Sequence, residues 1–240
     1  MLSIVIPAYN EEKRIASTLS LLRKKFPSAY IIVVFEGDDN TPEVVKQYGG
    51  TVIINKTRIG KGGSIKIGVQ KALGDKVLII DADLPTLDVE KLVNVDADLV
   101  IAHRDVSTMP PIRRFLHHAF VFLTKLFFPS LYRFHDFQAG VKVVKLNKLK
   151  EILHELVMND YVFDVNLVYS FVKRGYKVVE IPVKYYHKEE DSKISKKLIK
   201  IIIFMFLSLV KLRFFYSPFR KILYTKSFLK VQNWIINRLR

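Results

Sequence analysis

The sequence predicts an α/β protein: a doubly wound, mostly parallel sheet followed by C-terminal helices that associate with a membrane. Three observations support this fold class. Short β-branched apolar runs alternate with amphipathic segments over the first hundred residues, glycines and acidic residues follow several of these runs, and the last fifth of the chain mixes basic with aliphatic residues. A chain of 240 residues is long enough for one well-filled α/β domain with an appendage.

The first half of the chain alternates strand-like with helix-like segments. The strand-like runs occupy 2–6, 31–35, 51–55, 76–80 and 97–102. Helix-like segments lie between them, at 11–26, 41–48, 62–73 and 87–93. The continuous apolar run 77–80 is too short for a helix and fits a strand that is buried on both faces. This rhythm favours a parallel sheet whose ligands bind beyond the carboxyl ends of the strands.

The second half of the chain is less regular. Its predicted elements are a long, aromatic and basic helix (110–129), an extended segment (136–145), two helices (146–156 and 161–175) and an edge strand or strand pair (177–187). Pro182 favours an edge position, since proline cannot donate a hydrogen bond within a sheet. We therefore expect an α/β domain over residues 1–190 and a basic amphipathic segment over residues 191–240.

The net charge of +16 is concentrated at the C-terminal end of the chain. Residues 192–240 contain 12 Lys and Arg and no Asp or Glu, whereas the rest of the chain contains 27 basic and 23 acidic residues. This asymmetry indicates a polyanionic partner, either nucleic acid or an anionic lipid surface. The chain contains no cysteine, which excludes disulfides and thiolate metal sites. The first residues, MLSIVIPAYN, do not have the pattern of a signal peptide.

The apolar residues of the C-terminal segment favour lipid over nucleic acid. The run IIIFMFLSLV, residues 201–210, is bounded by Lys200 and Lys211. As a helix it rises about 15 Å, half of a ~30 Å hydrocarbon core. It could span a bilayer only if it extended over 198–215, with three basic residues inside the span. The following residues mix Phe, Ile, Leu and Trp with Lys and Arg, as interfacial helices do. We predict a membrane-surface anchor and no nucleic-acid binding; a buried core helix is the alternative for 198–215.

Two acidic residues follow the strand at 76–80. Side chains alternate along an extended chain, so Asp81 and Asp83 are expected to point the same way. Two like charges so close together repel each other unless a cation lies between them. The alternative is a turn in which the carboxylates accept hydrogen bonds from backbone amides.

The sequence SIVIPAYNEEKRI, residues 3–15, runs from a strand into a turn and an acidic segment. Residues at this mouth of the sheet are expected to form a wall on which a planar base can stack: Pro7, Ala8 and Tyr9. Glu11 or Glu12 is placed to accept a hydrogen bond from a base or ribose. Asn10 is also a good helix cap, and acidic residues suit the first turn of a helix, so a capping role is compatible with this interpretation.

A glycine-rich segment, NKTRIGKGGSIKIG, occupies residues 55–68 before a predicted helix. Glycines at this place let the backbone approach an anion, and Arg58 and Lys61 add positive charge. The spacing matches neither a P-loop nor a dinucleotide fingerprint, so ATP and NAD binding are not supported. A plain surface turn is the alternative.

Taken together, these segments resemble family-2 glycosyltransferases of the GT-A fold, through PAYNEE, NKTRIGKGGSIKIG and DAD. Within that family the sequence is most similar to polyprenyl-phosphate hexosyltransferases, the dolichol-phosphate mannose and glucose synthases. The segments that carry this resemblance are AHR (102–104), PIRRF (111–115), DFQAGVK (136–142), FDVNLVY (163–169), EIPVKYYH (180–187) and SK (192–193). They match in order over roughly residues 2–195.

The resemblance implies a nucleotide-sugar donor, UDP-glucose or GDP-mannose, and a divalent cofactor, Mg²⁺ or Mn²⁺, held by Asp81 and Asp83. It implies a nucleotide-sugar site formed by Pro7, Ala8, Tyr9, Glu11, Glu36, Asn55, Lys61, Asp81, Ala82 and Asp83. We assign the catalytic roles to Asp83 and Arg114. A hard cation with oxygen ligands would stabilise the departing diphosphate.

The resemblance also implies a polyprenyl or dolichyl phosphate acceptor at the cytoplasmic face of a membrane. Such a phosphate is already mostly ionised at neutral pH, so it needs positioning and charge neutralisation more than a general base. The expected acceptor-phosphate site consists of Arg104, Arg113, Arg114, Lys142 and Lys193. Asp136 is expected to orient the basic groups or the sugar, and Asp164 to brace a helix; a purely structural role is the alternative for each.

The sequence departs from the family pattern after the second predicted strand. The segment FEGDDNT, residues 35–41, has Phe35 and Glu36 where relatives carry a pair of aspartates that bind the base. The base of the donor can therefore be uracil or guanine. FDV, residues 163–165, favours glucose over mannose. The alternatives are a transferase of the same fold that adds sugar to a hydroxyl group, and a membrane-bound scaffold without catalytic activity.

Overall fold

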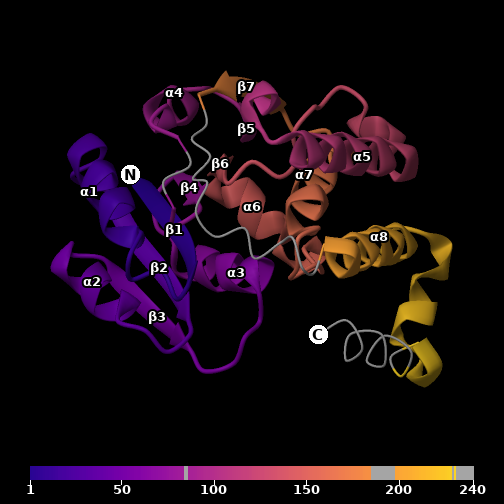
Figure 1. Ribbon diagram of the computed structural model, residues 1–240, viewed down its shortest axis with the longest axis horizontal. Coiled ribbons are helices and arrows are strands. Elements are labelled where there is room, and N and C mark those ends of the chain that lie inside the picture. The colour runs from indigo at the N-terminus through magenta and orange to yellow at the C-terminus, as the bar shows by residue number, and fades with distance from the viewer. Residues whose placement is uncertain (84–85, 185–197, 229, 231–240) are drawn as a thin grey trace.

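The computed structural model describes residues 1–83, 86–184, 198–228 and 230. Within these residues one seven-stranded sheet has the order β3-β2-β1-β4-β6-β5-β7 (Figure 1). Its strands are β1 (Leu2–Tyr9), β2 (Tyr30–Glu36), β3 (Thr51–Asn55), β4 (Lys76–Ile80), β5 (Leu99–Arg104), β6 (Val141–Lys145) and β7 (Val178–Val183). β6 runs antiparallel to β4 and β5, and the other pairs are parallel. The prediction of a mostly parallel α/β sheet is confirmed.

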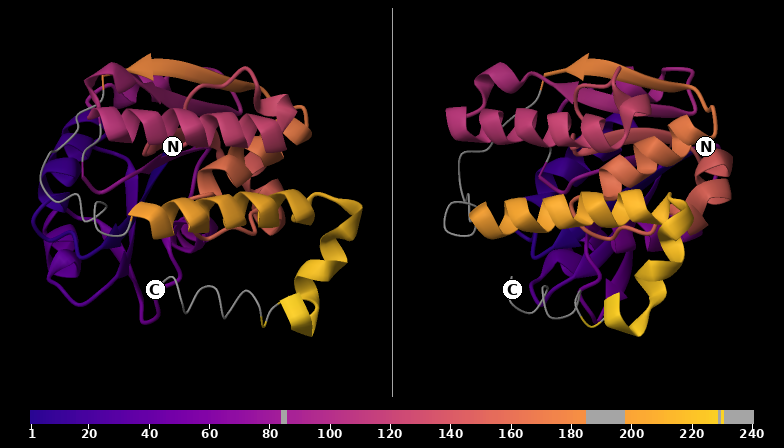
Figure 2. Two further views of the ribbon diagram at one scale, coloured as in Figure 1. Left: turned by 45° about the vertical axis from the view of Figure 1, so that its right-hand side comes forward. Right: turned by 90° about the vertical axis from the view of Figure 1, so that its right-hand side faces the viewer.

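Helices cover both faces of the sheet (Figure 2). They are α1 (Ile15–Lys25), α2 (Thr41–Gln47), α3 (Lys61–Lys71), α4 (Val89–Val93), α5 (Pro111–Phe127), α6 (Leu146–Ile152), α7 (Phe163–Lys173) and α8 (Leu198–Phe215). The alternation of side chains along the strands divides the core in two. Ile4 and Ile6 of β1 pack with α1, α2 and α4, whereas Val5 packs with α3 and the helices of the second half.

The structure corrects two predicted elements and confirms a third. The first helix begins at Ile15 rather than at residue 11, and Asn10 has a φ of 53°, so Asn10 is not its cap. The extended segment predicted over 136–145 forms a strand only at Val141–Lys145, and that strand is antiparallel. Pro182 lies in β7, which is an edge strand of the sheet, as its missing N–H requires.

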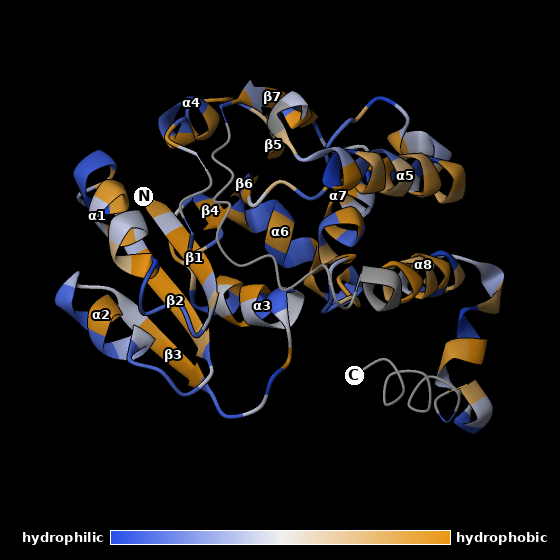
Figure 3. Cartoon of the chain, in the orientation of Figure 1, coloured by the Kyte–Doolittle hydropathy of each residue, from blue (hydrophilic) through white to orange (hydrophobic). Residues whose placement is uncertain are grey.

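Helix α8 packs against the rest of the protein along one side. Leu209 and Leu212 are buried in the same cluster as residues of α5 and α7. The ring of Phe206 meets that of Phe127 edge-on, with 6.0 Å between centroids, and the Ser208 hydroxyl donates to an Asp160 oxygen at 2.7 Å. Over its length α8 is mostly hydrophobic (Figure 3). No helix among the described residues has the length and apolar character needed to cross a membrane.

Candidate active site

The residues singled out in the sequence gather at one edge of the sheet. β1, β2, β3, β4 and β5 all point the same way, so their carboxyl ends share that edge. The strand ends carry or directly precede Tyr9, Glu36, Asn55, Asp81 and Arg104. The glycine-rich segment leads into α3 at the same edge. This is where ligands bind in open parallel sheets.

Asp81 is held in place by its neighbours in β4 and by the segment before β6. Its backbone N–H donates to the Gly140 carbonyl at 2.9 Å, and the Thr18 hydroxyl donates to the Ala82 carbonyl at 2.7 Å. The Ala82 side chain is buried in the core. A methyl group added at Gly140 would lie 2.2 Å from an Asp81 oxygen. The backbone of the D-x-D segment is therefore fixed by contacts with α1 and with the DFQAG segment.

Charges of alternating sign run from Asp81 into the protein. The Lys61 ammonium lies 2.9 Å from Asp81 Oδ1 and 3.5 Å from Asp164 Oδ2. Asp164 Oδ1 lies 2.7 Å from the Lys142 ammonium, and both of these side chains are buried. Burial opposes ionisation of Asp164, but the charges of Lys142 and Lys61 outweigh it and lower the pKa of this carboxyl. Asp164 thus joins the N-terminus of α7 to the glycine-rich segment through Lys61.

Glu11 brings a third carboxylate toward Asp81 and Asp83. Burial raises the pKa of Glu11, the ion pair with Arg14 lowers it, and repulsion from Asp83 and Asp81 raises it again, leaving it above its ordinary value. Asp81 and Asp83 offer carboxylate oxygens as ligands, whereas both oxygens of Glu11 accept hydrogen bonds from Arg14. Hard divalent cations such as Mg²⁺ and Mn²⁺ prefer such ligands, so the residues present fit the expected cofactor.

Glu36 supports the glycine-rich segment. It is buried, with only 4% of its surface exposed. Its oxygens accept hydrogen bonds from the Ile59 N–H at 3.2 Å, the Gly60 N–H at 3.4 Å and the Ser64 hydroxyl at 2.7 Å. The Glu36 carboxylate is therefore bound to the glycine-rich segment, and its part in nucleotide-sugar binding stays a prediction.

Tyr9 is the exposed part of the predicted wall. Its ring is 47% exposed, and the Arg58 guanidinium lies 4.2 Å from the ring centroid. Ala8, predicted to belong to the same wall, is instead buried in the core, and Pro7 is half-buried. Asn55, at the end of β3, is half-buried. The surface available for stacking is thus provided by Tyr9 with Arg58.

The predicted acceptor-binding residues differ in their surroundings. Arg104 makes two parallel contacts with the fully buried Asp136, at 2.6 and 2.8 Å. Arg113 and Arg114 lie in the first turn of α5. Lys142 is buried and contacts Asp164 and the Ala139 carbonyl at 2.7 Å each, which corrects its predicted place in an open phosphate clamp. Lys193 lies outside the described residues.

One contact that the sequence did not predict joins the residues that follow β1 and β2. The Asn10 side-chain amide donates to Asp38 Oδ1 at 2.9 Å, and the Asp38 N–H donates back to Asn10 Oδ1 at 3.0 Å. Asn10 adopts a φ of 53°, which asparagine tolerates better than most residues. An Asn directly after a strand can be read as a helix cap or as a turn residue, and only the fold distinguishes the two.

The comparisons with known proteins agree with this geometry. The family model for glycosyl transferase family 2 matches residues 3–153. The chain belongs to this family. It is 30% identical to the dolichyl-phosphate beta-glucosyltransferase of Homo sapiens over 218 residues, which cover 77% of this chain and 67% of the relative. It is also 30% identical to an uncharacterized protein of Methanocaldococcus jannaschii, over 85% of this chain and 98% of that protein.

Solved structures support the fold of this family-2 glycosyltransferase. Glucosyl-3-phosphoglycerate synthase from Mycobacterium tuberculosis, in complex with Mn²⁺, UDP-glucose and phosphoglyceric acid, superimposes with a TM-score of 0.66. The sequence identity is 19%, and the match covers 87% of this chain and 79% of that one. The predicted resemblance to family-2 GT-A enzymes, and among them to dolichyl-phosphate sugar synthases, is confirmed.

Proposed function

We propose that the protein transfers a hexose from a nucleoside-diphosphate sugar to a polyprenyl or dolichyl phosphate, with inversion at the anomeric carbon. UDP-glucose is the first candidate donor and GDP-mannose the second. The relatives named dolichyl-phosphate beta-glucosyltransferases support glucose, as does the FDV sequence at 163–165. The observation that carries the proposal is that the Asp81–Lys61 pair and the Arg104–Asp136 pair lie at the same edge of the sheet.

The donor side of the site is built from β1, β4 and the glycine-rich segment. Tyr9 and Arg58 are proposed to offer a stacking surface for the base. Glu36 fixes the glycine-rich segment, which is proposed to place Lys61 beside the diphosphate. Asp81 and Asp83 would hold Mg²⁺ or Mn²⁺, which when bound stabilises the charge of the departing diphosphate as a Lewis acid. Lys61, already beside Asp81, supplies further positive charge to the same oxygens.

On the acceptor side, positive charge replaces a general base. A phosphate oxygen of the acceptor forms the new bond to the anomeric carbon, while the bond from that carbon to the donor's diphosphate breaks and its electron pair leaves with the diphosphate. The phosphate is already ionised, so no proton has to be removed. Arg104, held by Asp136, and Arg113 and Arg114 are proposed to hold it. Lys193 is proposed to join them, whereas Lys142 acts indirectly by neutralising Asp164.

Helices α5 and α8 are proposed to face the membrane that holds the acceptor. They run side by side in both views of Figure 2 and touch through Phe127 and Phe206. Large apolar side chains on α5 remain exposed along one face: Ile112, Phe115, Phe122 and Leu126. On α8, Ile202, Ile203 and Phe206 are also exposed. Exposed apolar stripes beside basic residues are typical of helices that lie in a membrane interface, and we place this surface at the cytoplasmic face.

A panel of nucleotide sugars tests the proposal. Purified protein with Mg²⁺ or Mn²⁺ should transfer labelled sugar from UDP-glucose, or from GDP-mannose, to a short polyprenyl phosphate. Asp83→Ala should abolish transfer. Activity retained in that variant would refute the metal role of Asp83, and equal transfer to free polyprenol would refute the phosphate clamp. Absence of transfer from every nucleotide sugar would favour the non-catalytic scaffold.

A further inference from the structure

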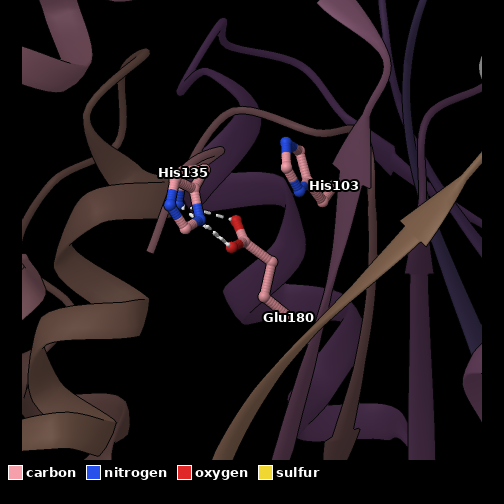
Figure 4. Close-up of side chains that lie close together, drawn as sticks. All are labelled: His103, His135 and Glu180. Carbon is pink, nitrogen blue, oxygen red and sulfur yellow. Dashed lines mark hydrogen bonds and ion pairs between the residues drawn. The ribbon is translucent and has the colours of Figure 1, made fainter. Parts of the chain in front are cut away.

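A second group of metal-ligating side chains lies beside the acceptor half of the site. His103 comes from the end of β5, His135 from the segment before β6, and Glu180 from β7 (Figure 4). One ligand atom from each of these residues lies within 4.8 Å of the others. The two imidazole rings are stacked, with 5.5 Å between centroids and 13° between planes. His135 Nδ1 lies 2.8 Å from Glu180 Oε2.

The carboxylate of this cluster is held firmly from one side. Glu180 Oε1 accepts hydrogen bonds from the backbone N–H groups of His135 at 2.9 Å and Asp136 at 2.7 Å. Metal ligands that are supported in this way by further hydrogen bonds are pre-oriented and bind more tightly. The side chain of His135 is 62% exposed, so solvent reaches the cluster and the ring is able to rotate toward a bound ion. In this cluster the Glu180 carboxylate is therefore fixed, whereas the His135 ring is able to adjust.

The chemistry of the cluster differs from that of the Asp81–Asp83 pair. Two imidazole nitrogens and one carboxylate oxygen are ligands that Zn²⁺ takes readily, with positions left over for water. Mg²⁺ and Mn²⁺ prefer sites made of oxygen. The two places are also separated in the fold, since β6 lies between β4, which precedes Asp81, and β5, which carries His103. Ligand type and position therefore both distinguish them.

We propose that His103, His135 and Glu180 form a Zn²⁺ site separate from the metal site of the transfer reaction. An ion at this site would join β5 and β7 to the segment before β6. That segment carries Asp136, which in turn holds Arg104. Zn²⁺ would accordingly restrain the loop that positions Arg104, while the proposed transfer itself uses a different ion.

Zn²⁺ titration of the full-length protein in saturating Mg²⁺ tests this site. The wild type should bind one equivalent of Zn²⁺ in calorimetry, and Co²⁺ used as an optical probe should give visible absorption bands from nitrogen coordination. His135→Ala should weaken binding by at least the ~10–100-fold that loss of a ligand's supporting partner costs. His154→Ala is the matched control, because His154 is also exposed and lies 3.8 Å from a carboxylate, that of Glu155. It should leave Zn²⁺ binding unchanged.

A further variant separates this inference from the proposed function. Asp83→Asn should lose sugar transfer but retain Zn²⁺ and Co²⁺ binding. Loss of the ion in Asp83→Asn, equal loss in His154→Ala, or unchanged binding in His135→Ala would each overturn the proposal. Because His135 is exposed, its substitution should leave the thermal unfolding of the Zn²⁺-free protein unchanged. A failure of sugar transfer in the wild type would refute the proposed function and leave the Zn²⁺ result standing.

Discussion

At the scale of single residues, the placement of Asp81 depends on Gly140, which is 59 positions away along the chain but lies beside Asp81 in the fold. Gly140 accepts the Asp81 N–H and leaves room for its carboxylate. Lys61 then contacts the same carboxylate from α3. The absence of a side chain at residue 140 therefore leaves the space in which the Asp81 oxygens lie.

We expect Gly140→Ala to reduce transferase activity while the protein remains folded. The new methyl group would meet Asp81 Oδ2 at 2.2 Å, so the carboxylate has to move by about 1 Å, and such a displacement costs about 100-fold in rate. Labelled-sugar transfer measures the effect. Gly175→Ala is the control: its φ of 72° strains any side chain, but the space around it is open, so it should lower thermal stability and leave activity intact. Unchanged activity in Gly140→Ala would contradict the argument.

Asp136 gives a prediction of pH dependence. Burial opposes its ionisation, but the contacts with Arg104 prevail and lower its pKa below the ordinary 3.8. A carboxyl group whose pKa is lower in the folded than in the unfolded state stabilises the fold fully at pH values above its unfolded-state pKa. This stabilisation is lost as the pH falls through the folded-state pKa. At pH 7 Asp136→Asn should therefore cost about 3–5 kcal/mol, because it removes the buried negative charge that Arg104 contacts. The difference between variant and wild type should shrink below about pH 4.

Denaturant unfolding at pH 7, 5, 4 and 3 checks this expectation. Asp164 also has a lowered pKa, but it is present in both proteins, so its contribution cancels in the difference. A difference in unfolding free energy that stays constant from pH 7 to pH 3 would show that the Asp136 charge does not stabilise the fold. At neutral pH the same variant should raise the KM for polyprenyl phosphate, since Arg104 loses its fixed orientation.

At the scale of elements, α8 belongs to the core that the α/β domain forms. Leu212 is fully buried against it, and the Tyr216 hydroxyl, just beyond the helix, contacts Asn166 and Ser170 of α7 at 3.1 and 2.7 Å. Burial raises the pKa of Tyr216 to about 12, so this hydroxyl stays protonated at neutral pH. These contacts favour the core-helix alternative for one side of residues 198–215, while the other side remains exposed.

Leu212→Ala should therefore destabilise the whole protein rather than release α8 alone. Removing a buried leucine side chain costs about 2–5 kcal/mol, and we expect this loss in a single cooperative transition measured by far-ultraviolet circular dichroism. Ile203→Ala, on the exposed side of the same helix, should change the unfolding free energy by less than about 0.5 kcal/mol. Two separate transitions in the wild type would instead support the predicted boundary near residue 190.

Local sequence patterns predicted where the strands and helices lie better than they predicted which strands pair and which side chains meet. Apolar runs and turn residues located β4 and placed Asp81 and Asp83 after it, because strand periodicity is a local property. The antiparallel direction of β6 and the burial of Lys142 depend on which strands become neighbours, and no local pattern encodes that. Glu36 shows the same limit: its acidic side chain at a strand end suggested a ligand, whereas in the fold it receives hydrogen bonds from a loop distant in sequence.

At the scale of the whole molecule, the proposed membrane binding combines two kinds of attraction. Among the described residues, α5 and α8 leave apolar side chains exposed on neighbouring helices. The sequence adds 12 basic residues and no acidic one after residue 191. Burial of apolar surface is insensitive to salt, whereas attraction between exposed charges is screened by it. The two contributions can therefore be separated experimentally.

We expect binding to vesicles of mixed neutral and anionic lipid to fall when salt rises from 0.1 to 1 M, as the screening length shortens from about 10 Å to about 3 Å. The binding that remains at high salt should match that to neutral vesicles and should be lost in a double variant, Phe115→Glu with Phe122→Glu. Each of these rings is more than two-thirds exposed, and burying a phenylalanine contributes about 1.5–3 kcal/mol. Ile54→Glu with Leu73→Glu, at exposed apolar positions away from α5 and α8, is the matched control and should bind like the wild type. Vesicle co-sedimentation that responds equally to both double variants, or to neither, would show that the membrane surface lies elsewhere.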